Sequence, residues 1–295
     1  MGALRTSDER FEDLPDWPYA PNYVDDLPGY EGLRVHYAQT GEGDRTFLCL
    51  HGQPTWGYLY RRMMPVLARE GRMIVPDWLG FGRSDKPVED ASYTFHFHRD
   101  MMLRLVERLD LQCITLVVQD WGGLIGLTLP MEAPERYERL IVMNTALATG
   151  RLPGAGFLAW RDYANANPDL DIAKLMQRAC PHLSDAEAEA YAAPYPDATY
   201  KAGVRRFPNL VMVEPDMEGV DVSKRAVAFW RDEWRGESFM AVGAQDPVLG
   251  SDTMERMRTV IRGCPKPLVL EQAGHFVQEW GEKVAEAALG SFASR

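Results

Sequence analysis

The chain has 295 residues, 46% of them hydrophobic and 25% charged, which is the balance of a globular protein with one large buried core. Its net charge of −11 is spread along the chain, which argues against nucleic acid or an anionic membrane as a partner, because both need clustered Lys and Arg. No apolar run approaches the roughly 20 residues that cross a bilayer, and no apolar signal segment opens the chain. The four cysteines show no paired spacing, so we expect a soluble protein of the reducing cytoplasm.

Apolar runs alternate with amphipathic stretches over the first half of the chain. We expect strands at residues 33–37, 46–50, 72–75, 113–118 and 140–143, and helices at 58–69, 97–109 and 123–133. Several of the strands are nearly continuous in Val, Ile and Leu, as strands buried on both faces are. This alternation predicts an α/β fold with a mostly parallel central sheet and helices on both faces.

The alternation breaks after Asn144 and resumes near residue 220. Residues 149–219 are rich in Ala, Pro, Tyr and Trp and contain helical patches but no convincing buried strand. Beyond them we expect helices at 222–234, 251–261 and 276–292, and strands at 238–242 and 267–270. The sequence therefore predicts a core of residues 1–148 and 220–295, interrupted by a helical cap of residues 149–219. Such a cap would enclose the ligand crevice that open α/β sheets form beyond the carboxyl ends of their strands.

Residues 117–123 read Val-Val-Gln-Asp-Trp-Gly-Gly and carry the sharpest chemical signal. Asp120 follows a predicted buried strand and precedes a helix, which is the setting of a nucleophile elbow, although Val118 stands where that motif usually has Gly. Asp also replaces the Ser of esterases. A carboxylate is ionised near neutral pH and can attack a tetrahedral carbon that bears a leaving group, which forms an ester. The alternative is that Asp120 only caps the following helix.

Two later residues could complete a catalytic set with Asp120. His275 follows the last predicted strand and has the pKa range needed to take a proton from the water that hydrolyses the ester. Asp246 follows the strand at 238–242 and would orient the imidazole. The order nucleophile, acid, histidine is the one that folds with this elbow use. The alternatives are a buried core histidine and a turn aspartate before proline; the rival acid position, Asn144, carries no charge.

The segment His51-Gly52-Gln53-Pro54 follows the strand at 46–50. In folds with a nucleophile elbow, one oxyanion-hole N–H comes from the residue after the nucleophile and one from the loop after this earlier strand. The pattern nominates the backbone N–H groups of Trp121 and Gln53. The segment also fits a tight turn that needs Gly52 and Pro54, and the two interpretations are compatible.

A departing halide needs hydrogen-bond donors that bring no competing nucleophile. The tryptophan indole offers one N–H and no acceptor. Trp121 lies next to Asp120 in the chain, and Trp160 is the best-placed second tryptophan in the predicted cap. Tryptophan is mostly a packing residue, so the pattern alone leaves Trp160 open.

Together these residues closely resemble the haloalkane dehalogenases, in particular the subfamily with an Asp-His-Asp triad and two halide-binding tryptophans. The likeness runs essentially from end to end and includes residues 25–30, 85–87, 117–123 and 273–279. It implies an α/β-hydrolase fold with Asp120 as nucleophile, His275 as base and Asp246 as acid. It also implies that Trp121 and Trp160 bind the halide. Residues that fall where the family lines its substrate cavity are Phe157, Phe207, Pro208 and Leu249.

The resemblance implies hydrolysis of a haloalkane to a primary or secondary alcohol, halide and a proton. Water is then the only co-substrate, with no cofactor and no metal. The main departure is Gln53, where relatives of this subfamily often have Glu and others Asn. Because the expected donor is the backbone N–H, we expect Gln53 to alter substrate preference rather than abolish activity.

Two other functions stay open on the sequence. An epoxide hydrolase shares the Asp nucleophile and needs acidic donors on the cap, where the tyrosines are Tyr163, Tyr191, Tyr195 and Tyr200. The other is a non-catalytic ligand-binding member of the fold, against which the complete set of Asp120, Asp246 and His275 argues. No exposed apolar repeat or heptad indicates a dimer, so we expect a monomer.

Overall fold

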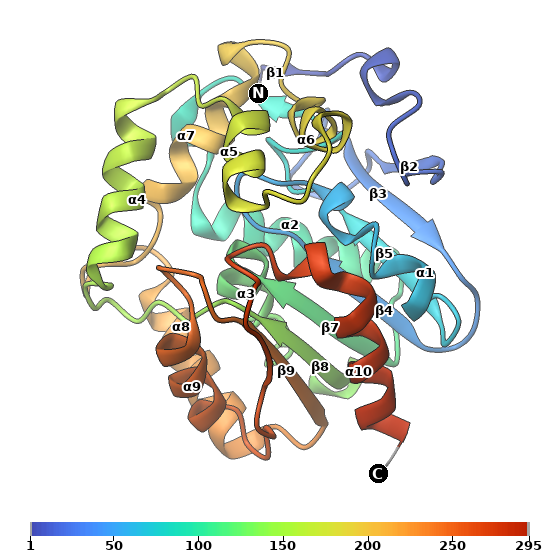
Figure 1. Ribbon diagram of the computed structural model, residues 1–295, viewed down its shortest axis with the longest axis vertical. Helices are drawn as coiled ribbons and strands as arrows, with labels where there is room; N and C mark the ends of the chain where they lie inside the picture. The colour runs from blue at the N-terminus through green and yellow to red at the C-terminus, as the bar shows by residue number, and fades with distance from the viewer. Residues whose placement is uncertain (1, 294–295) are drawn as a thin grey trace.

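An eight-stranded sheet forms the centre of the computed structural model, which describes residues 2–293 (Figure 1). The strands follow one another across the sheet in the order β10 (Leu268–Leu270), β9 (Glu237–Gly243), β8 (Tyr137–Met143), β7 (Ile114–Gln119), β4 (Thr46–Leu50), β5 (Arg72–Pro76), β3 (Val35–Thr40) and β2 (Pro21–Val24). Neighbours from β10 to β5 pair in parallel, whereas β3 and β2 pair antiparallel at one edge. The predicted fold class, a mostly parallel sheet with helices on both faces, is confirmed.

Helices cover both faces of this sheet. In the view of Figure 1, α10 (Gly281–Ala293) lies in front of the sheet, where it packs against α1 (Met64–Leu67), and α2 (Phe95–Arg108) lies behind. Behind the sheet α2 also packs on α3 (Trp121–Gly126), and the remaining core helices are α8 (Val220–Ala228) and α9 (Ser251–Val260). Every residue of β4 and β7 is buried, as expected for strands covered on both faces.

Between β8 and α8 the described chain forms no strand. It folds instead into the helices α4 (Ala155–Ala166), α5 (Ile172–Ala179), α6 (Asp185–Ala192) and α7 (Ala202–Arg206), and the short helices η5 (Ala198–Lys201) and η6 (Phe207–Asn209). In Figure 1 the arrows of β7 and β8 point toward the side of the molecule that carries these helices. The division into a core and a cap of residues 149–219 remains our prediction, and the outermost residues of the predicted core, 1 and 294–295, lie outside the described residues.

Two predicted helices are much shorter than the amphipathic pattern indicated, and proline explains both. The stretch 58–69 forms only η2 (Gly57–Tyr60) and α1, because Pro65 has no N–H to continue a helix from the preceding turn. The stretch 123–133 ends as α3 at Gly126, and Pro130 disfavours helical backbone in the residue before it. The sequence reading also missed β2 and the small pair β1 (Ala3–Leu4) and β6 (Lys86–Pro87).

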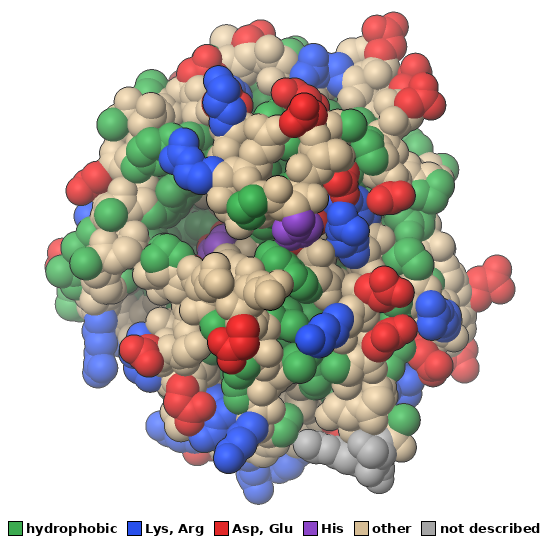
Figure 2. Space-filling view, in the orientation of Figure 1, with side chains coloured by type: hydrophobic (Ala, Val, Ile, Leu, Met, Phe, Trp, Pro, Cys, Tyr) green, Lys and Arg blue, Asp and Glu red, His purple; other side chains and the backbone are tan. Residues whose placement is uncertain are grey.

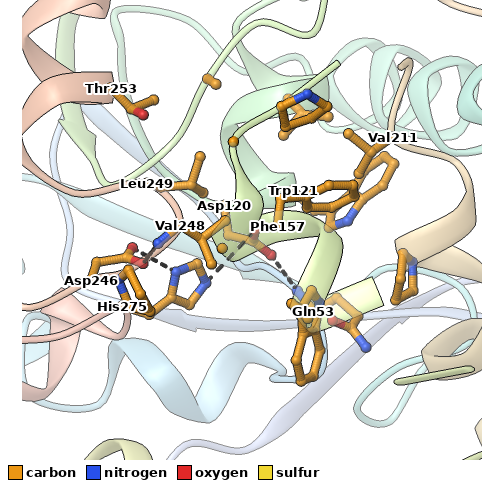
Figure 3. A pocket seen from close by; sticks show the side chains of 18 of the residues that line it. Gln53, Asp120, Trp121, Phe157, Val211, Asp246, Val248, Leu249, Thr253 and His275 are labelled. Atoms are coloured by element: carbon orange, nitrogen blue, oxygen red, sulfur yellow. Dashed lines mark hydrogen bonds and ion pairs between the residues drawn. The ribbon is translucent and has the colours of Figure 1, made fainter. Parts of the chain in front are cut away.

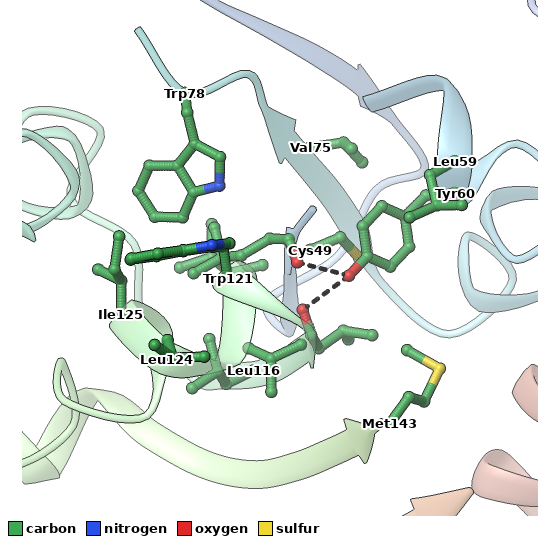
Figure 4. Close-up of a cluster of buried hydrophobic side chains, with 14 of the residues drawn as sticks. Cys49, Leu59, Tyr60, Val75, Trp78, Leu116, Trp121, Leu124, Ile125 and Met143 are labelled. Atoms are coloured by element: carbon green, nitrogen blue, oxygen red, sulfur yellow. Dashed lines mark hydrogen bonds between the residues drawn. The ribbon is translucent and has the colours of Figure 1, made fainter. Parts of the chain in front are cut away.

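A dense apolar core lies directly beneath the carboxyl ends of the central strands (Figure 4). The indoles of Trp121 and Trp78 both belong to this core and are almost completely buried. The hydroxyl of Tyr60 lies 2.8 Å from the carbonyl oxygen of Leu50 and 3.3 Å from that of Val117, which joins η2 to two strands. Among residues 2–293, no helix is both long and apolar enough to cross a bilayer.

Candidate active site

Asp120 occupies a sharp turn between β7 and α3. Its backbone has φ 50° and ψ −124°, outside the regions that non-glycine residues favour. The surroundings hold this turn: the Asp120 N–H donates to the carbonyl of Asn144 at 3.0 Å, and the Asp120 carbonyl accepts from the N–H of Gly123 at 2.9 Å. Such strain, placed between a buried strand and a helix, matches a nucleophile elbow, which holds the side chain at the carboxyl edge of the sheet.

Two glycines make room for the elbow. A Cβ on Gly52 would overlap the carboxylate of Asp120, and a Cβ on Gly122 would overlap the carbonyl of Leu50. Only glycine, which has no Cβ, allows these close approaches. Steric exclusion therefore explains why each of the two motifs has a glycine at this position.

The two N–H groups that the sequence nominated for an oxyanion hole converge on Asp120. The backbone N–H of Gln53 donates to Asp120 Oδ2 at 2.9 Å (Figure 3), and the N–H of Trp121 lies close enough to this carboxylate to lower the pKa of Asp120. Burial raises the pKa of Asp120 above its ordinary value, whereas His275 and these N–H groups favour the ionised form. One carboxylate oxygen, Oδ2, is therefore held by the backbone N–H of Gln53.

The loop that carries Gln53 is held on two sides. Burial lowers the pKa of His51, and the neutral ring donates from Nδ1 to the Gly52 carbonyl at 2.9 Å while Nε2 accepts from the Trp78 N–H at 3.2 Å. The side-chain amide of Gln53 donates to the carbonyl of Val204 in α7 at 3.0 Å. The polar group that departs from the family pattern thus connects the core to the helices above it.

His275 lies between two carboxylates (Figure 3). Its Nδ1 lies 2.8 Å from Asp246 Oδ2, and its Nε2 lies 3.7 Å from Asp120 Oδ1. Burial alone would lower the pKa of His275, but the charges of Asp246 and Asp120 outweigh it and raise the pKa to about 9. Burial alone would raise the pKa of Asp246, but His275 and other hydrogen-bond donors lower it to about 2. Asp246 is therefore an ionised acceptor that keeps the proton of His275 on Nδ1.

Asn144 supports this acid, a role that sequence reasoning missed. Its side-chain amide donates to Asp246 Oδ2 at 2.9 Å and accepts from the N–H of Gly243 at 2.9 Å. The N–H of Val248 donates to the other oxygen of Asp246 at 2.8 Å. The signal for this role is the position of Asn144 at the end of β8, next to the strand that precedes Asp246.

A cavity of about 1180 Å³ opens beside these groups, and Figure 2 shows a hollow with a histidine at its floor and hydrophobic and basic side chains around it. Asp120, Asp246 and His275 line the cavity, as do both predicted halide tryptophans, Trp121 and Trp160.

In the described part of the chain, the indole N–H groups of Trp121 and Trp160 have no protein acceptor. The indole N–H of Trp78, in contrast, donates to the His51 carbonyl.

Three of the four predicted wall residues line this cavity, namely Phe157, Pro208 and Leu249. Phe207 does not: it is fully buried, and its ring packs 4.7 Å from that of Trp121. The expectation for Phe207 is thus corrected: the ring packs on the indole of Trp121 and is not part of the cavity wall.

Of the four tyrosines in the predicted cap, only Tyr163 lines the cavity. Tyr191 is buried against Arg61 and Glu279, and the hydroxyl of Tyr195 donates to the Pro54 carbonyl at 3.3 Å. Within residues 2–293, no group of three or more His, Cys, Asp or Glu side chains is arranged to hold a metal ion.

Comparison with known proteins agrees with this geometry. The family model described as the alpha/beta hydrolase fold matches residues 45–282. A haloalkane dehalogenase of Psychrobacter cryohalolentis is 42% identical over 97% of this chain and 96% of its own length, and haloalkane dehalogenase 1 of Mycobacterium tuberculosis is 42% identical over 98% of each. Among solved structures, the tetrameric haloalkane dehalogenase DpaA of Paraglaciecola agarilytica is 50% identical, with a TM-score of 0.97 over 99% of both chains.

Proposed function

This chain belongs to the haloalkane dehalogenase family of α/β-hydrolases, and on that premise we propose that it hydrolyses haloalkanes to a primary or secondary alcohol, halide and a proton. The observation that carries the proposal is the placement of the Asp120 carboxylate and two unpartnered indole N–H groups on the wall of one cavity. An ionised nucleophile and donors for an anionic leaving group are the two requirements of displacement at an alkyl carbon.

In the first step, Asp120 attacks the carbon that bears the halogen. Oδ2 is held by the Gln53 N–H, so Oδ1 is the oxygen that forms the new bond to carbon. The carbon–halogen bond breaks with its electron pair on the halide, which the indole N–H groups of Trp121 and Trp160 stabilise. The product of this step is an alkyl ester on Asp120, and no proton has moved.

In the second step, a water attacks the ester carbonyl carbon of Asp120 while His275 Nε2 takes its proton. The negative charge that develops on Oδ2 is stabilised by the N–H groups of Gln53 and Trp121; in other enzymes, loss of one such donor costs on the order of 10²–10³ in rate. The intermediate collapses by cleavage of the bond between Cγ and Oδ1, and the alcohol leaves with the proton from His275. Loss of the remaining proton to solvent restores the carboxylate.

This route makes a distinctive isotope prediction. The oxygen of the alcohol comes from Asp120, and the oxygen of water enters the carboxylate. In a single turnover with excess enzyme in H₂¹⁸O, the alcohol carries ¹⁶O and Asp120 gains ¹⁸O. Alcohol that carries ¹⁸O from the first turnover would mean direct attack of water on the substrate.

Halide release from a panel of short bromo- and chloroalkanes tests the activity itself. Asp120→Ala is the control, because it removes the nucleophile and leaves the cavity. The epoxide hydrolase alternative is less well supported, since only Tyr163 of the tyrosines in the predicted cap lines the cavity. Diol formation from alkyl epoxides without halide release would favour it, and binding without turnover of either substrate would favour a ligand-binding protein.

The monomeric state and the cytoplasmic location expected from the sequence remain predictions. The DpaA structure is described as tetrameric, which makes the oligomeric state of the present chain a direct question. Light scattering on the purified protein measures its mass in solution and answers it.

A further inference from the structure

The residue immediately before the nucleophile contacts the main chain of the base. Gln119 ends β7 and is completely buried. Its side-chain amide donates to the carbonyl oxygen of His275 at 3.0 Å. The same oxygen accepts from the N–H of Val277 at 3.1 Å, so both of its lone pairs are used.

This contact matters because His275 lies outside regular structure. It follows β10 and precedes η8 (Val277–Trp280), where no strand pairing or helical ladder fixes the backbone. Asp246 holds one nitrogen of the ring, and Gln119 holds the main chain at the carbonyl. The two contacts come from different parts of the sheet, so together they restrict both translation of the loop and rotation of the ring.

The amide of Gln119 is itself oriented. The side-chain N–H of Gln278 lies 3.5 Å from the amide oxygen of Gln119, and Gln278 is completely buried. Because the Gln119 oxygen faces this donor, its NH₂ group faces the His275 carbonyl. The buried pair Gln119 and Gln278 thus joins the nucleophile strand to the segment that carries the base.

We propose that Gln119 is a positioning residue that acts through the main chain of His275 and sets the gap between His275 Nε2 and Asp120 in which the hydrolytic water is activated. The inference rests on the proposed function, since it concerns the second step of that reaction. Displacements on the order of 1 Å in such a site can cost 10²-fold in rate. Attack by Asp120 involves no proton transfer, so the effect of Gln119 falls on ester hydrolysis and not on halide release.

Gln119→Leu removes the donor at similar volume, and Gln119→His returns an N–H donor at a similar reach. Thr115→Val is the matched control: Thr115 lies on the same strand, is fully buried, and its hydroxyl has no hydrogen-bond partner among residues 2–293. Rapid-quench measurement with a bromoalkane separates the halide burst from the later turnover rate. NMR titration of the His275 ring in the same variants reports its surroundings, the facing charged groups being Asp246 and Asp120.

The proposal predicts that Gln119→Leu keeps the halide burst, slows ester hydrolysis about 10- to 100-fold, and moves the His275 pKa toward its ordinary value. Gln119→His restores hydrolysis, and Thr115→Val matches the wild type in all measurements. Equal slowing of burst and hydrolysis, or a His275 titration unchanged in Gln119→Leu, would overturn it. Absence of any halide release by the wild type would refute the proposed function, while the His275 titration still decides whether Gln119 positions the ring.

Discussion

The imidazole Nε2 of His275 lies 3.7 Å from Oδ1 of Asp120, within ion-pair distance but too far for a good hydrogen bond. The pair therefore attracts without sharing a proton, and the separation leaves the carboxylate free to act as a nucleophile. The same imidazole is hydrogen-bonded to Asp246 at 2.8 Å. The charge on Asp120 thus controls the protonation of the base that later acts on its ester.

This coupling predicts how the rate of ester hydrolysis depends on pH. In the free enzyme, Asp246 and Asp120 together raise the pKa of His275 to about 9, so the ring is protonated at neutral pH and cannot accept a proton. Ester formation removes the charge of Asp120, so the pKa of His275 falls and the neutral ring becomes available. In single-turnover experiments, ester hydrolysis should rise with pH through a pKa below about 9. Hydrolysis that falls as pH rises through this range would contradict the assignment of His275 as base.

The two cavity tryptophans should act on the halide. Trp121→Phe and Trp160→Phe each remove one N–H donor, and a hydrogen bond to a charged group contributes about 1.5–3 kcal/mol, or roughly 10- to 100-fold in affinity. Bromide binding, measured by quenching of tryptophan fluorescence, should weaken by that factor, and the halide burst should slow. Trp280→Phe is the control because Trp280 does not line this cavity. Equal bromide affinity in all three variants would show that the indoles only pack.

Asn144 should stabilise the charged form of Asp246. Asn144→Leu removes a donor 2.9 Å from Asp246 Oδ2, so the pKa of Asp246 should rise from about 2 and the ring of His275 should be held less firmly. We expect ester hydrolysis to slow about tenfold, in line with the loss of one hydrogen bond to a charged group, with the halide burst retained. Wild-type rates of both steps in Asn144→Leu would contradict this prediction and indicate that Asn144 only packs.

A buried ionic cluster should contribute to stability through the helices above the site. Arg61 is fully buried and bonds Glu279, which follows His275 by four positions, and Glu187 of α6. Arg61→Met leaves the buried Glu279 carboxylate with only the partly exposed guanidinium of Arg62, at 3.1 Å. Because breaking a buried ion pair costs about 3–5 kcal/mol and Arg62 keeps part of this one, we expect a loss at the lower end of that range. Urea unfolding measures this change. The control Arg231→Met removes an exposed ion pair with Asp232 and should change the free energy of unfolding little; equal effects of the two substitutions would contradict the prediction.

Local patterns in the sequence were sufficient for the features that depend on neighbouring residues. The buried strands β4 and β7 read as mostly apolar runs, and the turn after β7 is visible as Asp120 followed by Trp121 and two glycines. The predicted placement of Asp246 and His275 at strand ends also follows from the parallel order of the sheet, in which carboxyl ends meet at one edge.

Features that depend on contacts between distant segments were not predictable in the same way. Gln119 and the His275 carbonyl are 156 positions apart, and nothing in either local pattern shows that their polar groups meet. Phe207 shows the same limit, because its position against Trp121 depends on how η6 packs on the core. The prediction of one helix over 58–69 was wrong for a local reason. Pro65 interrupts the helix despite the amphipathic pattern around it.

Covalent capture of the intermediate tests the nucleophile most directly. His275→Phe removes the base but leaves the Asp120 carboxylate, so reaction with a bromoalkane should release one equivalent of bromide and stop at the ester. Mass spectrometry of the intact variant should show an added alkyl group, and peptide mapping should locate it on Asp120, with no adduct in the Asp120→Ala, His275→Phe double variant. An unmodified His275→Phe protein after bromide release, or an alkyl group on another residue, would contradict the account.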